Sequence, residues 1–296
     1  MPDLTLAAAA LTACGLFGAS GAYTQDVRAA SVDPNSLRYI KSAVGAGATS
    51  GLSIAAKPVE FVNLADNRTP TIRVRPKVRW YSFSVPYPWS SSFRIEPLSD
   101  AHAIVVQTQS CRLYELYNAS FTANALSAYG GAVWNLREPF APLPPGKSSA
   151  MASGLSLYAG AVRWEEIARG DVPHALNWAI TAGSAAQWDF VRPASNAEAI
   201  PFKGHTGYRL PYGARLRLRD SFDISRFGPQ SAAIARAMKT YGIYLADTAR
   251  SNQLYSLNAL DGSNRWNARD LSALSSIHLS DFQVLTLGKI QRVPGH

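Results

Sequence analysis

LSDAHAIVVQTQSCRLYELYNA, residues 98–119, contains two short apolar runs separated by a polar break. Residues 104–106 are a β-branched run, and residues 107–110 supply the break. Residues 111–117 then alternate, which is the two-residue period of a strand with one buried face. The stretch therefore predicts two adjacent strands near the centre of the fold.

The same stretch places ionisable side chains in an apolar framework. Asp100 and His102 are two residues apart, so on a strand they face the same way. Glu115 has large neighbours and would share its face with Leu113 and Tyr117. Asp100, His102 and Glu115 are therefore candidate catalytic residues that converge in a cleft. The alternative interpretation is that Glu115 is a structural carboxylate paired with an arginine.

Composition bounds the class of protein and its partners. The 296 residues are 47% hydrophobic and only 17% charged, so the chain can bury a substantial core. Its 7 Trp and 13 Tyr are typical of a secreted β-rich protein with aromatic surfaces. The net charge of +9 favours an anionic partner such as an acidic polysaccharide or a membrane surface. No DNA- or RNA-binding signature is present, so we expect no nucleic-acid partner.

The two cysteines bear on export and anchoring. Cys14 lies in LTACG behind the apolar residues 4–11, which resembles a bacterial lipoprotein signal, although the basic residues that begin an export signal are absent. The apolar run is too short to span a bilayer. We expect a signal segment over residues 1–18, a secreted or periplasmic/outer-surface lipoprotein, and membrane contact only through a lipidated Cys14. Cys111 would then be unpaired and buried.

The rest of the chain predicts one β-rich body. Residues 19–54 are small and polar and predict a leader or linker, and residues 55–296 predict a single domain with short strand-like runs and Gly/Pro turns. Brief helices are expected at 163–168, 229–241 and 268–275, and none alternates with strands as βαβ units require. The predicted fold class is mainly β, a jelly-roll-like antiparallel β-sandwich with a few short helices.

Two segments alternate basic and apolar residues. The basic positions are Arg73, Arg75, Lys77 and Arg79 in the first and Arg215, Arg217 and Arg219 in the second. Pro76 predicts that the first is an edge strand. Each basic face is either a solvated outer sheet surface or a platform for an acidic glycan, because guanidinium groups bind carboxylates bidentately.

Common catalytic motifs are absent from the sequence: there is no GxSxG, no HExxH and no phosphate-binding glycine loop. His174 opens a strand-like run and is placed to enter a cleft, or it is a histidine bonded to a backbone carbonyl. Asp100, His102, Glu115 and His174 could together hold a divalent metal or act as an acid/base group. No cofactor is certain, and these two interpretations stay open.

Aromatic residues supply the sugar-binding prediction, since the C–H faces of sugars stack on aromatic rings. The candidate substrate-binding residues are Trp134, Tyr129, Trp188, Arg192 and Tyr117. The alternative is that most of these rings are core.

Several segments carry a family resemblance. They are Asp100–Val106, Cys111–Tyr117, Gly154–Gly160 with Arg163–Glu166, His174–Leu176, Leu216–Ile224, Met238–Ile243 and Asp281–Val284. In these segments the chain resembles an uncharacterised family of secreted bacterial β-sandwich proteins associated with carbohydrate-binding modules. The resemblance implies a jelly-roll-like fold acting on polysaccharide. Relatives tend to carry acidic residues at the positions of Asn135 and Met151 and a histidine near Asn196, so an inherited activity would be altered here.

Two main functions follow. The first is a secreted or lipid-anchored polysaccharide-degrading enzyme, a glycoside hydrolase before a lyase, with Asp100 and Glu115 as acid/base and His102 and His174 orienting them or binding a metal. The second is a non-catalytic, lectin-like carbohydrate-binding protein. A structural envelope lipoprotein is a weaker third alternative.

Overall fold

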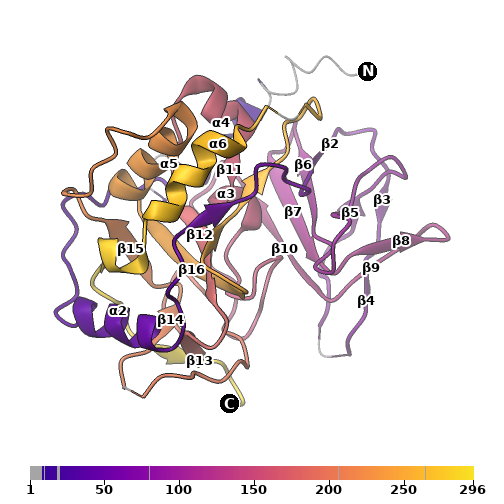
Figure 1. Ribbon diagram of the computed structural model, residues 1–296. Helices are drawn as coiled ribbons and strands as arrows, with labels where there is room; N and C mark the ends of the chain where they lie inside the picture. Colours follow the sequence, from indigo (N-terminus) through magenta and orange to yellow (C-terminus); the bar gives the residue numbers. More distant parts are fainter. Residues whose placement is uncertain (1–8, 10, 19–20, 80, 206, 264) are drawn as a thin grey trace.

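The structure is a computed structural model that describes residues 9, 11–18, 21–79, 81–205, 207–263 and 265–296. Strands outnumber helices, and they fall into several small sheets with a helix-bearing part on one side and an all-strand part on the other (Figure 1). The predicted mainly β class is confirmed. Most of the proposed signal segment lies outside the described residues.

The predicted hairpin is at the centre of a four-stranded sheet in the order β10-β7-β6-β2. Strand β6 (Ala103–Gln107) pairs antiparallel with β7 (Arg112–Tyr117), as predicted from their alternation. Strand β10 (Gly130–Asn135) pairs antiparallel with β7, and β2 (Val62–Ala65) runs parallel to β6. Asp100 precedes β6, and the left-handed backbone at Ala101 (φ 45°) separates it from the strand's alternation.

The larger sheet has six strands and mixed direction. Its order is β1 (Ser53–Ile54), β17 (Gln253–Leu254), β12 (Leu176–Thr181), β16 (Ile243–Ala249), β15 (Arg215–Leu218) and β19 (Phe282–Val284). The β12/β16 and β1/β17 pairs are parallel, and the other pairs are antiparallel. Central β12 is buried along almost its whole length, as a strand covered on both faces must be.

Four smaller sheets complete the described β structure. They are β14 (Leu210–Tyr212)–β13 (Ala185–Phe190)–β20 (Gln291–Arg292), β4 (Arg75–Pro76)–β9 (Ala125–Ala128)–β8 (Ser120–Thr122), β3 (Thr71–Ile72)–β5 (Tyr87–Pro88) and β11 (Val162–Arg163)–β18 (Ser256–Leu257). Strand β4 carries Pro76 at a sheet edge, as predicted. The described sheets establish the mainly β class. Because they mix parallel and antiparallel pairs, the antiparallel jelly-roll sandwich stays a prediction.

The three predicted helices are present. They are α4 (Trp164–Arg169), ended by left-handed Gly170, α5 (Pro229–Thr240), with proline in its first turn, and α6 (Ala268–Leu271), capped by the Asn267 side chain and followed by the 3₁₀ turn η1 (Ser272–Ser276). The sequence missed α2 (Ser36–Gly45), whose buried Ile40 and Ala43 face the sheet near β19. It also missed α3 (Leu157–Gly160) and the 3₁₀ turn η2 (Leu279–Asp281).

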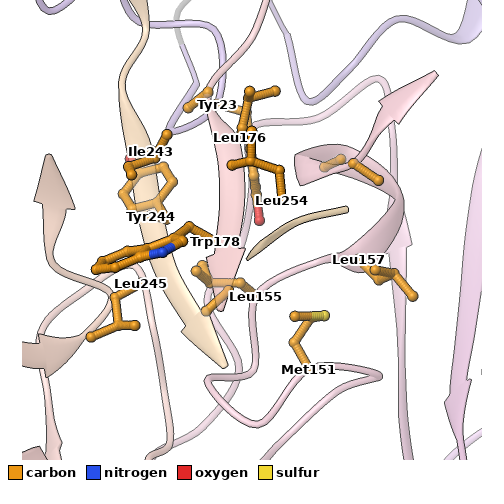
Figure 2. Packing of buried hydrophobic residues seen from close by; sticks show 14 of the residues in the cluster. Tyr23, Met151, Leu155, Leu157, Leu176, Trp178, Ile243, Tyr244, Leu245 and Leu254 are labelled. Atoms are coloured by element: carbon orange, nitrogen blue, oxygen red, sulfur yellow. The ribbon is translucent and has the colours of Figure 1, made fainter. Parts of the chain in front are cut away.

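The main core lies between the six-stranded sheet and the elements that cover it. Trp178 on β12 is fully buried, and Met151, Leu155 and Leu157 belong to the same cluster (Figure 2). Met151 is one of the positions at which an acidic residue was expected in relatives. Its burial in this apolar cluster explains why methionine suits the position in this chain.

The cysteine prediction is wrong. Cys14 and Cys111 form a disulfide across 97 residues of sequence, so Cys111 is not unpaired and Cys14 Sγ has no thiol to carry a lipid. A disulfide is consistent with an extracytoplasmic location, where the environment is oxidising. Among the described residues, every helix is too short or too polar to cross a bilayer.

The two basic faces differ. Arg73, Arg75, Lys77 and Arg79 are exposed, as predicted. Arg217 is instead buried and donates hydrogen bonds to the carbonyl oxygens of Val27, Arg28 and Ala30. The prediction of a solvated or glycan-facing surface is therefore wrong at Arg217, which holds the N-terminal segment against β15.

Candidate functional site

Glu115, on strand β7, is completely buried, and its carboxylate contacts the N-terminal end of the short helix α3. Its carboxylate accepts hydrogen bonds from the hydroxyl of the N-cap residue Ser156 (2.7 Å) and from Leu157 N (3.0 Å) and Tyr158 N (2.9 Å), two buried N–H groups in the first turn of α3 that have no partner within the helix. Burial raises the pKa of Glu115 to about 7, against these donors, which lower it. No arginine partner of the predicted kind is among its described contacts, and the carboxylate joins β7 to α3.

His102 shares a sheet face with Glu115, as the sequence parity predicts. Ile104 pairs with Glu115 in the β6/β7 register, so His102, two residues earlier, lies diagonally across from Glu115 and opposite Tyr117. The His102 ring contacts the Tyr117 ring, with centroids 6.0 Å apart. Asp100 is exposed, and its carbonyl oxygen accepts a hydrogen bond from Asn118 N. Of the three residues predicted to converge here, His102 and Glu115 share a sheet face, whereas Asp100 is exposed before the strand begins.

His174 belongs to a different cluster. Its Nε2 lies 3.1 Å from Glu166 Oε2, and its Nδ1 lies 2.8 Å from the Ala175 carbonyl oxygen. Arg163 also forms an ion pair with Glu166. The described contacts of His174 are thus those of a structural histidine bonded to a backbone carbonyl, the alternative left open by the sequence.

The predicted sugar-binding residues are scattered. Trp134 is core, donates to the Ala141 carbonyl oxygen and packs against Phe17 and Phe140. Trp188 stacks on the His296 ring, and Arg192 donates to the Leu143 carbonyl oxygen. Tyr117 and Tyr129 remain partly exposed, at 38% and 42%, and their backbones are bonded where Tyr129 N donates to the Tyr117 carbonyl oxygen.

The sequence reasoning missed a pair of carboxylates near Tyr117. Glu198 Oε2 accepts hydrogen bonds from Tyr212 Oη (2.7 Å) and Thr248 Oγ1 (2.6 Å). Asp247, which precedes Thr248 in the sequence, accepts hydrogen bonds from Ala152 N (2.9 Å) and from Thr248 N (2.8 Å). Thr248 therefore bridges the two acids, which come from β16 and from the loop after β13.

A β-bulge presents Asp247. The β12/β16 register shifts between Trp178 and Ala179, whose partners are Leu245 and Asp247, so Ala246 is the extra residue. Bulges re-aim side chains and are common beside active sites. The Ala246 carbonyl oxygen accepts from Ser153 N, which fixes the loop whose Ala152 N–H binds Asp247. The motif LAD at the end of an apolar strand was the available sequence signal.

The environment of Asp247 favours its protonated form. Burial and, after it, the charge of Glu198 raise the pKa of Asp247 to about 7, against the Ala152 and Thr248 N–H groups, which lower it. Asp247 and Glu198 are both partly accessible to solvent, although dense protein surrounds Asp247. A carboxyl group with a raised pKa beside a second carboxylate is typical of an acid/base site.

Further acidic groups surround the same region. Burial raises the pKa of Tyr255, and the negative charges that add to this are those of Asp247, Asp100, Glu60 and Glu198. The pKa of Tyr117 is also raised, first by burial and then by Asp100, Asp247 and Glu198. We call the group of Asp100, Glu198, Asp247, Tyr117 and Tyr255 the acidic cluster. It is a local concentration of negative charge in a chain of net charge +9.

Next to this acidic cluster lies a second group of side chains, of the types that bind metal ions. Ligand atoms of Glu60, Glu96 and His102 all lie within 4.8 Å of one another. The loop 150–152 connects the two groups, because His102 Nε2 lies 3.1 Å from the Ala150 carbonyl oxygen and Ala152 N binds Asp247.

Two pockets lie elsewhere on the surface. One is lined by apolar residues such as Leu16 and Leu260 together with Arg163 and Arg169. The other lies between Arg192 and Arg215. Neither is lined by Asp247 or Glu198. The first is lined by Glu165 and Glu166, but both carboxylates are hydrogen-bonded within the protein, as are Arg163, Arg192 and Arg215. The acidic cluster is therefore the better candidate site on chemical grounds.

A comparison of the chain with known protein families, curated proteins and solved structures finds no match. The predicted resemblance to secreted bacterial β-sandwich proteins is left as a hypothesis. The functional argument therefore depends on the residues of the site.

Proposed function

We propose that the protein is a polysaccharide-degrading enzyme of glycoside hydrolase type that acts outside the cytoplasm, with Asp247 as general acid and Glu198 as its partner carboxylate. The observation that supports this most directly is the Thr248-bridged pair of carboxylates, in which burial raises the pKa of Asp247 to about 7. Glycoside hydrolases use such a pair on the two sides of the scissile bond.

The roles follow from the environments. A protonated Asp247 would donate its proton to the glycosidic oxygen as the C–O bond breaks. Glu198, held by the Tyr212 and Thr248 hydroxyls, would either activate the water that adds to the sugar or attack the anomeric carbon itself. The separation of the two carboxyl groups in a sugar complex distinguishes these two routes.

Substrate binding would use side chains near the acidic cluster. The exposed rings of Tyr117 and Tyr129 offer apolar faces for a sugar, and Lys77 lies over the Tyr129 ring. Lys77 is one of the exposed basic residues of 73–79, which favours an acidic glycan as substrate. The jelly-roll-like sandwich remains part of this proposal, supported by the antiparallel β10-β7-β6 pairing.

The test is release of reducing ends from neutral and uronic-acid polysaccharides by the full chain. We expect Asp247→Asn and Glu198→Gln each to lower turnover about 10²- to 10⁴-fold with the fold intact. Glu138→Gln is the matched control, since Glu138 is exposed and contacts Asn135. Full activity in Asp247→Asn would refute the assignment. Unsaturated products that absorb in the ultraviolet would identify a lyase instead.

A non-catalytic carbohydrate-binding protein is the second candidate. The partly exposed rings of Tyr117 and Tyr129 favour it, because sugar stacking on a ring needs no acid/base partner. In affinity gel electrophoresis, retardation by a polysaccharide that the protein does not cleave, lost in Tyr117→Ala, would establish binding as the function.

A further inference from the structure

We propose that Glu60, Glu96 and His102 form a binding site for a divalent transition-metal ion of the zinc class. The site is separate from the Asp247–Glu198 pair, and its test does not depend on the proposed enzymatic function. Three segments of the chain build it: the residues before β2, the loop before β6 and the entry to β6 itself.

The sheet register brings two of the ligands together. Strands β2 and β6 run parallel with Val62 beside Ile104, so the same register two residues earlier puts Glu60 beside His102. Glu96 is fixed from a third direction, because its N–H donates to the His102 carbonyl oxygen (2.9 Å) and its carboxylate accepts from His102 N (3.0 Å). These contacts preorganise the ligands before any ion arrives.

The orientation of the His102 ring turns one nitrogen toward the two carboxylates, and this nitrogen would give up any proton to bind a cation. Its Nε2 lies 3.1 Å from the Ala150 carbonyl oxygen, which can only accept, so Nε2 carries the proton. Metal-binding histidines commonly donate their second N–H to a backbone carbonyl in this way. The other nitrogen, Nδ1, points toward the two carboxylates.

Nδ1 has no hydrogen bond in this position. It lies 2.6 Å from Glu96 Oε2, close enough for an ion pair, but without the orientation of a hydrogen bond. The His102 side chain is only 7% exposed, so water does not readily reach this nitrogen. A buried ring nitrogen that faces two carboxylates without a well-oriented hydrogen bond is a position where a cation can replace the ion pair.

His174 shows the contrast within the same molecule. Its Nε2 makes an oriented hydrogen bond to Glu166, and Arg163 forms an ion pair with the same carboxylate. Among the described residues, no lysine or arginine forms an ion pair with Glu60 or Glu96. One imidazole cannot neutralise two carboxylates, whereas a divalent cation can.

The ligand set selects the class of ion. One imidazole nitrogen and two carboxylate oxygens suit zinc, and three protein ligands leave a fourth position open. Calcium and magnesium prefer oxygen ligands alone. Ligand atoms around zinc lie about 3.3 Å apart at bond lengths of about 2.0–2.1 Å, so the group must contract from its present spread of up to 4.8 Å. Glu60 can make this movement, because it is partly exposed and its carboxylate accepts from the adjacent Val59 N.

The experiment is calorimetric titration of the chelator-treated full chain with Zn²⁺, with Ca²⁺ and Mg²⁺ titrated in parallel. We expect one Zn²⁺ per chain and no comparable binding of the other two ions. Glu60→Gln should weaken Zn²⁺ binding at least 10-fold with the fold retained, since the glutamine oxygen can still accept from Val59 N. His102→Gln should abolish binding.

His278→Gln is the matched control, because His278 is exposed and would bind zinc only adventitiously. Two results would overturn the proposal: no saturable Zn²⁺ binding, or Zn²⁺ binding that Glu60→Gln leaves unchanged. Glu60→Gln remains decisive if His102→Gln does not fold. Glycan cleavage plays no part in these measurements, so failure here leaves the Asp247–Glu198 assignment standing.

Discussion

The hydroxyl of Ser156 donates a hydrogen bond to Glu115 Oε1 at 2.7 Å and also accepts one from Ala159 N at 3.1 Å. Through this contact the central strand β7 is bonded to the first turn of α3. The Ser156 carbonyl oxygen in turn accepts from Asn177 Nδ2 on β12 (2.8 Å). A line of buried hydrogen bonds therefore connects the four-stranded sheet to the six-stranded sheet, and Glu115 is its first member.

We predict that Glu115→Gln destabilises the protein by about 2–3 kcal/mol. The backbone N–H groups of Leu157 and Tyr158 each donate to a different oxygen of the Glu115 carboxylate, and in glutamine one of these oxygens becomes an NH₂ group that cannot accept. The free energy of unfolding, from denaturant titration, measures this. Glu138→Gln at an exposed position should change it by less than about 0.5 kcal/mol. Unchanged stability in Glu115→Gln, with activity lost, would instead support the catalytic role first predicted for Glu115.

Glu166 should make stability depend on acid pH. Burial alone would raise its pKa, but Arg163 and His174 outweigh burial and lower the pKa to about 2. The unfolded chain then binds the proton more readily. The stabilisation, on the order of 3 kcal/mol, is present above the ordinary pKa of glutamate and is lost as the pH falls from about 4.5 to about 2.

Denaturant titrations between pH 7 and pH 3 check this prediction. In Glu166→Gln the loss of stability over that range should shrink, although the variant is less stable at pH 7. Equal pH dependence in the variant and the parent protein would contradict it.

The disulfide should contribute to stability mainly by restricting the unfolded chain. Cys14 and Cys111 are 97 residues apart, and closing so long a loop is worth about 2–5 kcal/mol in a folded protein. We expect reduction to lower the melting temperature of the parent protein and to leave that of the Cys14→Ser/Cys111→Ser double variant unchanged. A parent melting temperature insensitive to the reductant would show that the cysteines are not paired.

Asp247 should set the alkaline limb of the pH–rate profile. Its pKa is raised to about 7 by burial and by Glu198, so a general acid at this position is lost as the pH rises through 7. We expect turnover to fall about tenfold per pH unit above this value.

Glu198→Gln removes the neighbouring charge and should move the titration of Asp247 to lower pH. Carboxyl-carbon NMR of aspartate-labelled protein follows this titration without requiring activity. A titration of Asp247 at the same pH in both proteins would mean that the two carboxylates do not interact.

The sequence by itself determined the local structure. The alternation in residues 98–119 predicted β6 and β7, because a strand with one buried face must repeat every two residues. Pro229 at the start and Gly242 just past residue 241 predicted α5. It also predicted that His102 and Glu115 share a face, which follows from strand geometry once the hairpin forms.

Only the tertiary structure decided which groups meet. Asp247 and Glu198 are 49 residues apart in sequence and come together through a bulge and the Thr248 hydroxyl, neither of which has a local sequence pattern. Glu60 reaches His102 through the parallel register of β2 and β6. The Cys14–Cys111 pairing spans 97 residues, and a sequence gives residue types along the chain without the distances between them. Chemistry at a site depends on those distances. The strands could therefore be predicted from the sequence, whereas the carboxylate pair could be identified only in the folded protein.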